Sequence, residues 1–167
     1  DDPTHPARFS GLVAKEAEGV VLADLVFDYV VKVGDNPEKL RVFQVNQSSD
    51  ITFRNSVFDG DFARETRPTA DGFGAGQGLV LRGTKGITIE NCEFRDWFRA
   101  VVISQSSEIV FRGNNLHSIR SDGVDFAAVT QLLVENNLFH DFARSSTAGD
   151  HADMIQFWTN GTKTPTV

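Results

Sequence analysis

Apolar and polar positions alternate along this chain in a short pattern that recurs. The copies span 20–27, 51–58, 87–94, 109–116 and 132–139. Their starting positions are separated by 31, 36, 22 and 23 residues. Repeats of this length are typical of solenoids, in which each unit covers the apolar face of its neighbour. Because the alternation has the period of a β-strand, the repeat predicts a solenoid made of strands, a β-helix.

Each unit is predicted to contain another strand, which lies N-terminal to the recurring segment. It contains an apolar residue six positions ahead of each full copy: Val45, Leu81, Ile103 and Phe126. Leu12 and Ala14 fit a first unit, and Ile155 and Phe157 start a sixth. The polar and glycine residues between the two strands suit a tight turn. The pattern therefore predicts an all-β coil of about six rungs.

Equal positions of successive rungs lie about 4.8 Å apart in such a coil, so recurring side chains form ladders. One predicted ladder is apolar and mostly phenylalanine, of which the chain has 14: Phe27, Phe58, Phe94, Leu116 and Phe139. Another consists of asparagines at the bend before it: Asn55, Asn91 and Asn136, with Asn114 and Asn137 one position further on. Asparagine tolerates the left-handed backbone of a sharp corner and can hydrogen-bond along a stack. Both ladders are interpreted as structural.

The length of the units varies at one corner. From the apolar ladder to the next strand, the chain runs 16, 21, 7, 8 and 16 residues in successive units. Insertions at one corner of a solenoid emerge on one face, which is often the binding face. The insertions at 60–76 and 143–152 therefore predict two walls around a floor. The residues expected on the floor are Arg95, Asp96, Trp97, Arg99, His117, Arg120, Asp122 and Asp125.

Charge and composition narrow the classes of function. A net charge of −7 and a pI near 5 argue against a nucleic-acid binder, which is usually basic. A single cysteine, Cys92, excludes an internal disulfide and is expected to be a buried, inert thiol. The sequence contains no run of about 18 consecutive apolar residues, so it predicts no helix that spans a membrane.

The ends of the chain suggest a piece of a longer coil. It begins without Met or a signal peptide and stops within a unit, so residues 1–167 are interpreted as a single β-helix domain that has been processed or truncated. An unfinished sixth rung would expose an apolar end, so end-to-end self-association is expected.

Four acidic residues gather where the last floor turn meets the second wall: Asp122, Asp125, Asp150 and Asp153. The register predicts that Asp153 stacks over Asp122 and Gln156 over Asp125. Carboxylates one rung apart repel each other unless a proton, an arginine or a cation lies between them. The four acids could therefore supply the ligands of a Ca²⁺ ion, act as a general acid and its partner, or be solvated turn residues.

Other side chains near this corner could bind or process a ligand. His151 is the first choice for a general acid or base, because a histidine titrates near neutral pH. Arg99 and Arg120 could hold a sugar carboxylate, or could pair with Asp96 or Asp122 instead.

Two tryptophans and one histidine complete the predicted substrate-binding set. Trp97 and Trp158 are apolar platforms on which sugars could stack, although Trp158 could also simply cover the open corner. His117 adjoins the floor, with a hydrogen-bonded structural role as the alternative.

The rungs, the asparagine ladder and the segment Asp122-Gly123-Val124-Asp125 resemble the right-handed parallel β-helix of the pectate-lyase-like superfamily, over essentially the whole chain. Within that group the chain looks most like bacterial alginate C5-epimerase modules and alginate or pectate lyases. The resemblance implies a secreted, extracellular protein, an anionic uronate polysaccharide as its partner and, often, Ca²⁺. The epimerase core Tyr-Gly-x-Asp-Pro-His has its nearest counterpart in residues 148–151, which keep the Asp-His pair and lack the Tyr and the Pro.

Three functions follow as hypotheses. In the first, Arg99, Arg120 or Ca²⁺ neutralises a uronate carboxylate and His151 removes the C5 proton. Expulsion of the C4 oxygen then gives a lyase, and reprotonation from the other face gives an epimerase. The second is a glycoside hydrolase with paired aspartates, in which a separation of roughly 6.5–9.5 Å favours inversion. The third is a non-catalytic coil, either a carbohydrate-binding or adhesin-type module or a tail-fibre-like shaft.

Overall fold

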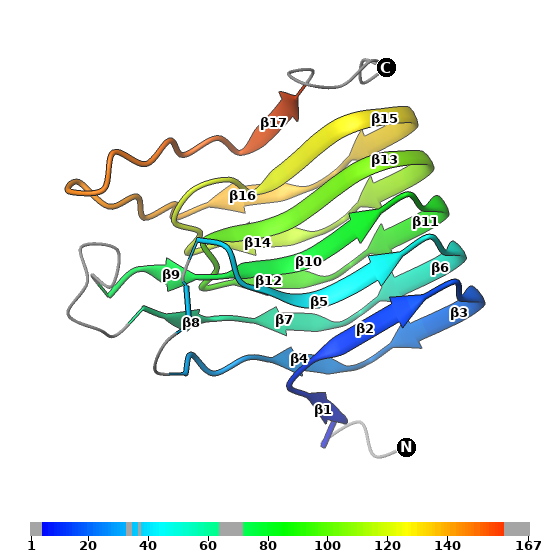
Figure 1. The fold of residues 1–167 in the computed structure, drawn as a ribbon, viewed down its shortest axis with the longest axis horizontal. Helices are drawn as coiled ribbons and strands as arrows, with labels where there is room; N and C mark the ends of the chain where they lie inside the picture. Colours follow the sequence, from blue (N-terminus) through cyan, green and yellow to red (C-terminus); the bar gives the residue numbers. More distant parts are fainter. Residues whose placement is uncertain (1–4, 33–34, 37, 64–71, 159–167) are drawn as a thin grey trace.

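The strands of the protein wind into a parallel coil, which Figure 1 shows rising from the N-terminal to the C-terminal end. This computed structural model describes residues 5–32, 35–36, 38–63 and 72–158. All elements in these ranges are β-strands, as the sequence predicts. β8 (Asp61–Phe62) and β9 (Gly74–Ala75) form a small antiparallel pair, whereas the strands of the coil pair in parallel. Within the described ranges no helix is long and apolar enough to cross a membrane.

Two sheets run the length of the coil. The first consists, in order, of β1 (Arg8–Phe9), β4 (Val26–Asp28), β7 (Val57–Asp59), β12 (Glu93–Arg95), β14 (Asn115–His117) and β16 (Leu138–His140). The second follows the order β2 (Leu12–Lys15), β5 (Arg41–Asn46), β10 (Gln77–Arg82), β13 (Arg99–Arg112), β11 (Lys85–Glu90), β6 (Ser49–Arg54) and β3 (Glu18–Ala23). To β13 it adds β15 (Val124–Glu135), which in turn pairs with β17 (Ile155–Trp158).

The pairing register confirms the repeat. The first apolar position of each copy is aligned across five rungs: Val20, Ile51, Ile87, Ile109 and Leu132. One detail differs from the prediction, because β13 and β15 each run through the expected turn as one bent strand. Gln105 and Glu108 have positive φ angles of 53° and 58°, so they turn the chain inside β13 while its pairing continues.

The second bend is built as the asparagine ladder predicts. Its residues have φ between 50° and 64° in every rung: Asp24, Asn55, Asn91, Gly113 and Asn136. One position further on, the Asn114 side chain donates to Asn137 Oδ1 at 3.0 Å and to the backbone carbonyl of Ile89 in β11, on the preceding rung, at 3.0 Å. These bonds satisfy buried backbone groups at a corner where strand pairing alone would leave them unpaired.

The core is a column of stacked aromatic rings. Phe58 stacks on Phe27 with ring centroids 4.4 Å apart and on Phe94 at 4.6 Å. These three rings are almost wholly buried and lie in register on β4, β7 and β12. Cys92 is buried in the same core, as predicted, and burial raises the pKa of its thiol to about 11.

Trp97 belongs to this core and is not a platform for sugars. Its ring is fully buried, donates from Nε1 to the Phe58 carbonyl at 2.9 Å and stacks on Tyr29. The prediction of an exposed Trp97 is therefore wrong. Space for the ring comes from glycine, since a Cβ at Gly60 or Gly78 would lie within 2.8–3.0 Å of the indole.

We predict that Phe58→Ala lowers the free energy of unfolding by about 3–5 kcal/mol, because it empties the middle of the stack. Urea denaturation followed by circular dichroism measures this loss. Val21→Ala is the control, since that side chain is 58% exposed and its truncation should cost less than about 0.5 kcal/mol. Equal losses for the two variants would contradict a stacked core.

Candidate functional site

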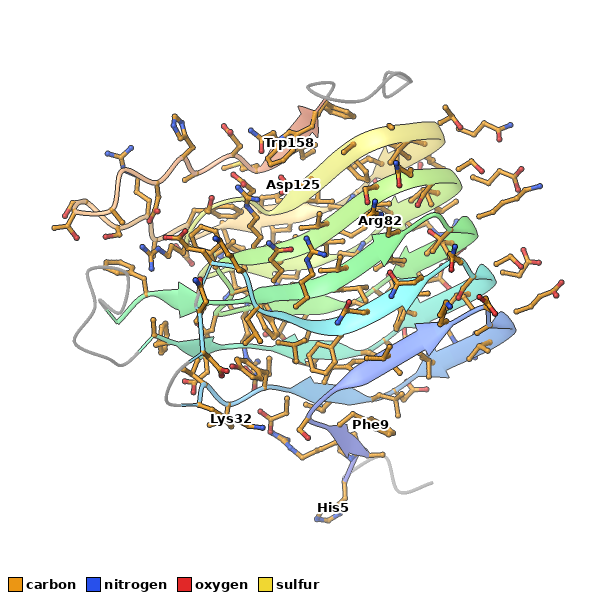
Figure 2. The ribbon with its side chains drawn as sticks, in the orientation of Figure 1. His5, Phe9, Lys32, Arg82, Asp125 and Trp158 are labelled. Atoms are coloured by element: carbon orange, nitrogen blue, oxygen red, sulfur yellow. The ribbon has the colours of Figure 1, made fainter. Side chains whose placement is uncertain are left out.

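A cleft of about 330 Å³ opens near the C-terminal end of the second sheet. It is lined by Glu38, Phe98, Arg99, Ser121, Asp122, Ala148, Gly149, Asp150, His151, Gln156 and Trp158. The coil supplies its floor at the start of β13, at the corner before β15 and at β17. The segment between β16 and β17 supplies one wall. Figure 2 shows Asp125 and Trp158 near each other at this end of the coil.

Two buried carboxylates share one guanidinium on the floor. Arg99 Nε lies 2.7 Å from Asp122 Oδ2 and 3.6 Å from Asp125 Oδ2. Asp122 and Asp125 are 1% and 2% exposed, so both carboxylates are buried. The outward-facing position of Asp125 in β15 is covered by Arg99 and by the next rung, where Gln156 lies beside it in register.

Several buried polar atoms on the floor make no hydrogen bond with any described residue. Asp122 Oδ1, both carboxylate oxygens of Asp125 and Gln156 Oε1 are such acceptors, and Arg99 Nε is such a donor, because it approaches Asp122 Oδ2 as an ion pair without hydrogen-bond geometry. One positive guanidinium faces two carboxylates, so a single proton on the pair would make the group neutral and would provide a missing donor. Burial strongly favours such a neutral group.

The pKa directions of the two acids agree with one retained proton. Burial, together with the charge of Asp122, raises the pKa of Asp125 to about 7, although Arg99 opposes the rise. Burial also raises the pKa of Asp122, while Arg99 and a hydrogen bond from Ser121 oppose the change. The pair titrates as a unit, because each carboxylate lies in the field of the other.

A second arginine, Arg120, holds the wall segment between β16 and β17 against the coil. Arg120 is wholly buried and donates from Nε to Asp150 Oδ2 at 2.7 Å. The same oxygen accepts the backbone N–H of Ser145, and Ser121 Oγ donates to the His151 carbonyl at 2.9 Å. These three bonds attach a polar segment, which has little apolar surface to bury, to the corner of the coil.

Two of the predicted functional side chains face the cleft from this wall and from β17. His151 is exposed and lines the cleft. Trp158 lines it from β17, and Arg99 lies over its ring at 5.2 Å from the centroid. The indole and the guanidinium therefore form a stacked pair on the floor.

Several predicted residues lie elsewhere. His117 is on the first sheet, where Nε2 contacts Glu93 at 3.0 Å and the ring stacks on His140, so its assignment to the floor is wrong. Arg95 pairs there with Asp59 at 2.8 Å. Asp153 stacks over Asp122 through its backbone, whose carbonyl accepts the Gly123 N–H, but its side chain is exposed and does not line the cleft.

The walls are also placed differently from the prediction. Residues 143–152 do form one wall. The described parts of 60–76 do not line the cleft but pack over Trp97, and 64–71 lie outside the described residues. The second contribution comes from Glu38, which the sequence analysis missed. The long interval from Phe27 to Phe43 was the signal for this insertion, but nothing in the sequence showed where it would lie.

The described acids do not fit the Ca²⁺ site that the sequence suggested. Among the residues that the structure describes, no group of three or more His, Cys, Asp or Glu side chains could hold a metal ion. Arg99 occupies the space between Asp122 and Asp125, and Arg120 neutralises Asp150. A role for Ca²⁺ stays a prediction.

We predict that Asp125 makes the fold less stable as the pH rises. Its pKa is raised from 3.8 to about 7 on folding, so its favourable contribution is complete below pH 3.8 and is lost as the pH rises through 7. Asp125→Asn mimics the protonated acid and should remove this dependence, with a gain at pH 8 on the order of 4 kcal/mol. Urea denaturation between pH 4 and pH 8 compares the two proteins. Parallel pH profiles would contradict a raised pKa.

We predict that Asp150→Asn loosens the wall, because it leaves the charge of buried Arg120 uncompensated at a cost of about 3–5 kcal/mol. Hydrogen exchange should become faster in residues 143–151 than in β13. Asp141→Asn, an exposed carboxylate next to the same segment, is the control and should leave exchange in the wall unchanged. An equal increase in hydrogen-exchange rate in residues 143–151 and in β13 would show general destabilisation and would contradict a specific role of Asp150 in holding the wall.

Comparison with known proteins places the fold. No curated protein matches the chain. Tailspike protein 2 of Escherichia coli O157:H7 bacteriophage CAB120 is similar in structure, with a TM-score of 0.62 and 12% identity over 92% of this chain and 20% of the tailspike chain. At that identity the likeness shows the fold alone, and this chain spans a fifth of the tailspike's length. Residues 41–153, more than half of the chain, match the family described as right handed beta helix region. The protein therefore belongs to the right-handed β-helix family.

Proposed function

We propose that the cleft binds a polysaccharide and cleaves a glycosidic bond by acid–base catalysis with carboxylates. The pair Asp122 and Asp125, buried against a single guanidinium at an open cleft, carries this proposal. A carboxyl group that keeps its proton near neutral pH is what a general acid requires. Trp158 beside it offers an apolar ring on which a sugar can stack.

Each residue has a defined part in the proposed reaction. Asp122, which lines the cleft, delivers the proton of the pair to the glycosidic oxygen. The C1–O bond breaks, and its electron pair stays with that oxygen. A water molecule forms the new bond to C1 and gives its proton to a second carboxylate. We assign that role to Glu38, which lines the same cleft from another segment of the chain.

Asp122 and Asp125 are too close to be the acid and the base themselves. Their contacting oxygens both lie within 3.6 Å of the same nitrogen, so these oxygens are closer together than the roughly 6.5–9.5 Å between the carboxyl groups of inverting glycosidases. The pair therefore acts as one proton-holding unit. The inverting enzyme suggested by the sequence would use Glu38 as the second carboxylate.

A second candidate is chemistry at C5 of a uronate, giving elimination or epimerisation on an extracellular anionic polymer. The observation in its favour is that His151 lines the cleft together with Arg99. It ranks second because Arg99 and Arg120 are already neutralised by Asp122 and Asp150. A sugar carboxylate would have to compete with these buried partners.

We predict that Asp122→Asn lowers kcat by about 10²–10⁴, the usual contribution of a general acid, and that Glu38→Gln has a similar effect. The protein would be incubated with alginate, polygalacturonate and the neutral polymer pullulan. New reducing ends, ultraviolet absorbance and product NMR would be recorded. The control is Asp50→Asn, an exposed turn residue whose positive φ asparagine tolerates.

The readouts separate the candidates. Reducing ends without absorbance, lost in Asp122→Asn and kept in His151→Ala, support hydrolysis. Absorbance that His151→Ala abolishes would establish elimination in its place, and a change at C5 without chain cleavage would establish epimerisation. Binding with no chemical change would reduce the protein to a carbohydrate-binding module.

A further inference from the structure

A second hollow, separate from the cleft, lies where the first strand of each rung turns into the next. It has a volume of about 500 Å³ and is lined by Lys15, Asn46, Gln47, Arg82, Gly83 and Gln105. These residues come from four successive rungs, so the hollow extends along the coil axis. None of them belongs to the cleft described above.

The hollow exists because one rung lacks a side chain. Gln47, Gly83 and Gln105 follow residues paired in register and have φ of 49°, 63° and 53°, so they occupy the same left-handed corner of three rungs. Both neighbours of Gly83 show that glutamine can adopt this backbone. A Cβ at Gly83 would meet only Gln47 Cγ, at 3.9 Å. Neither φ nor space therefore requires glycine, and its effect is to open a gap between two amide side chains.

The chemistry of the lining suits an anionic sugar unit. Arg82 lines the hollow and donates from Nε to Gln105 Oε1 at 3.2 Å. Lys15 adds a second cation, which pairs with Glu16 at 3.2 Å. A guanidinium fork binds a carboxylate well, and the side-chain amides of Asn46 and Gln47 can donate to and accept from sugar hydroxyls.

The hollow and the cleft open on the same face of the second sheet. Arg82, Ser104, Ala127 and Trp158 are register neighbours across β10, β13, β15 and β17. Three rung spacings separate Arg82 from Trp158, on the order of 14 Å. Figure 2 shows both labelled side chains on this face. Between them the column carries only Ser104 and Ala127, so no bulky side chain stands in the path.

We propose that the Gly83 hollow is a second saccharide subsite, which receives a carboxylate-bearing sugar unit of a chain that runs along the sheet face to the cleft. The continuity with the cleft rests on the proposed function. Binding of the sugar unit in the hollow does not, because Lys15, Arg82 and the amides form the subsite by themselves. The cleft is rich in carboxylates and the hollow in cations, so the two ends of the face would select different units of one polymer.

The test is a titration of the ¹⁵N-labelled protein with trigalacturonate, with maltotriose as the neutral α-1,4-linked control. We expect saturable shifts of the backbone amides of Gln47, Gly83 and Gln105 with trigalacturonate and none with maltotriose. Gly83→Gln fills the gap with the side chain that its neighbours carry and should weaken binding by at least about tenfold. Gly19→Asn places a side chain on another open glycine with φ of 68° and should leave binding unchanged.

The outcomes are separable from those of the cleft. No shifts at these amides, equal shifts with maltotriose, or undiminished binding by Gly83→Gln would overturn the subsite. If all three polysaccharides stay intact in the activity assay while the shifts vanish in Gly83→Gln, the subsite stands and the proposed catalysis falls. Binding that Asp122→Asn abolishes and Gly83→Gln preserves would place the sugar acid in the cleft and contradict the proposal.

Discussion

Stacking of the rungs in register is the constraint on which the rest of this structure depends. Parallel pairing places each residue beside its equivalent on the neighbouring rung. The side chains at equivalent positions of the five rungs must therefore all pack against one another. Phe58 can stack on both neighbours only because the rungs do not slip. At the second bend the rungs share a left-handed backbone, which suits the asparagines and the glycine found there. Function is confined to what the constraint leaves free, the outward-facing columns and the insertions at one corner.

The cleft shows how a solenoid can bury charge at its surface. Outward-facing Asp125 would be solvated on an ordinary rung, but the following rung and Arg99 cover it. Its burial makes a net charge costly, which raises the pKa of the Asp125 carboxyl group and favours its pairing with Arg99. Arg120 and Asp150 solve the same problem beneath the wall. The burial that requires a counter-charge therefore also raises the pKa of Asp125 toward neutral pH.

The cleft and the Gly83 hollow differ because one lies at insertions between strands and the other lies within regular rungs. The cleft arises where insertions of unequal length leave the coil, so its wall is held by a few polar bonds such as that between Ser121 and His151. The Gly83 hollow arises within regular rungs, from one missing side chain between paired strands. A polymer that spans both would meet a fixed subsite at one end and an adjustable wall at the other.

The repeat by itself determined the coil, the register, the phenylalanine and asparagine ladders and the stacking of Gln156 over Asp125, because these follow from local alternation and fixed spacing. It also placed His151 and Trp158 near Asp122, since all three lie within one rung of the same corner. Only the tertiary structure decided the rest. Trp97 turned inward because glycines elsewhere in the chain leave room for its ring. Arg99 pairs with Asp122 and Arg120 pairs with Asp150, because three-dimensional packing brings these oppositely charged groups within reach of each other. Glu38 lines the cleft because the path of its long insertion depends on the surface that the insertion crosses. The spacing of residues in the sequence does not encode that path.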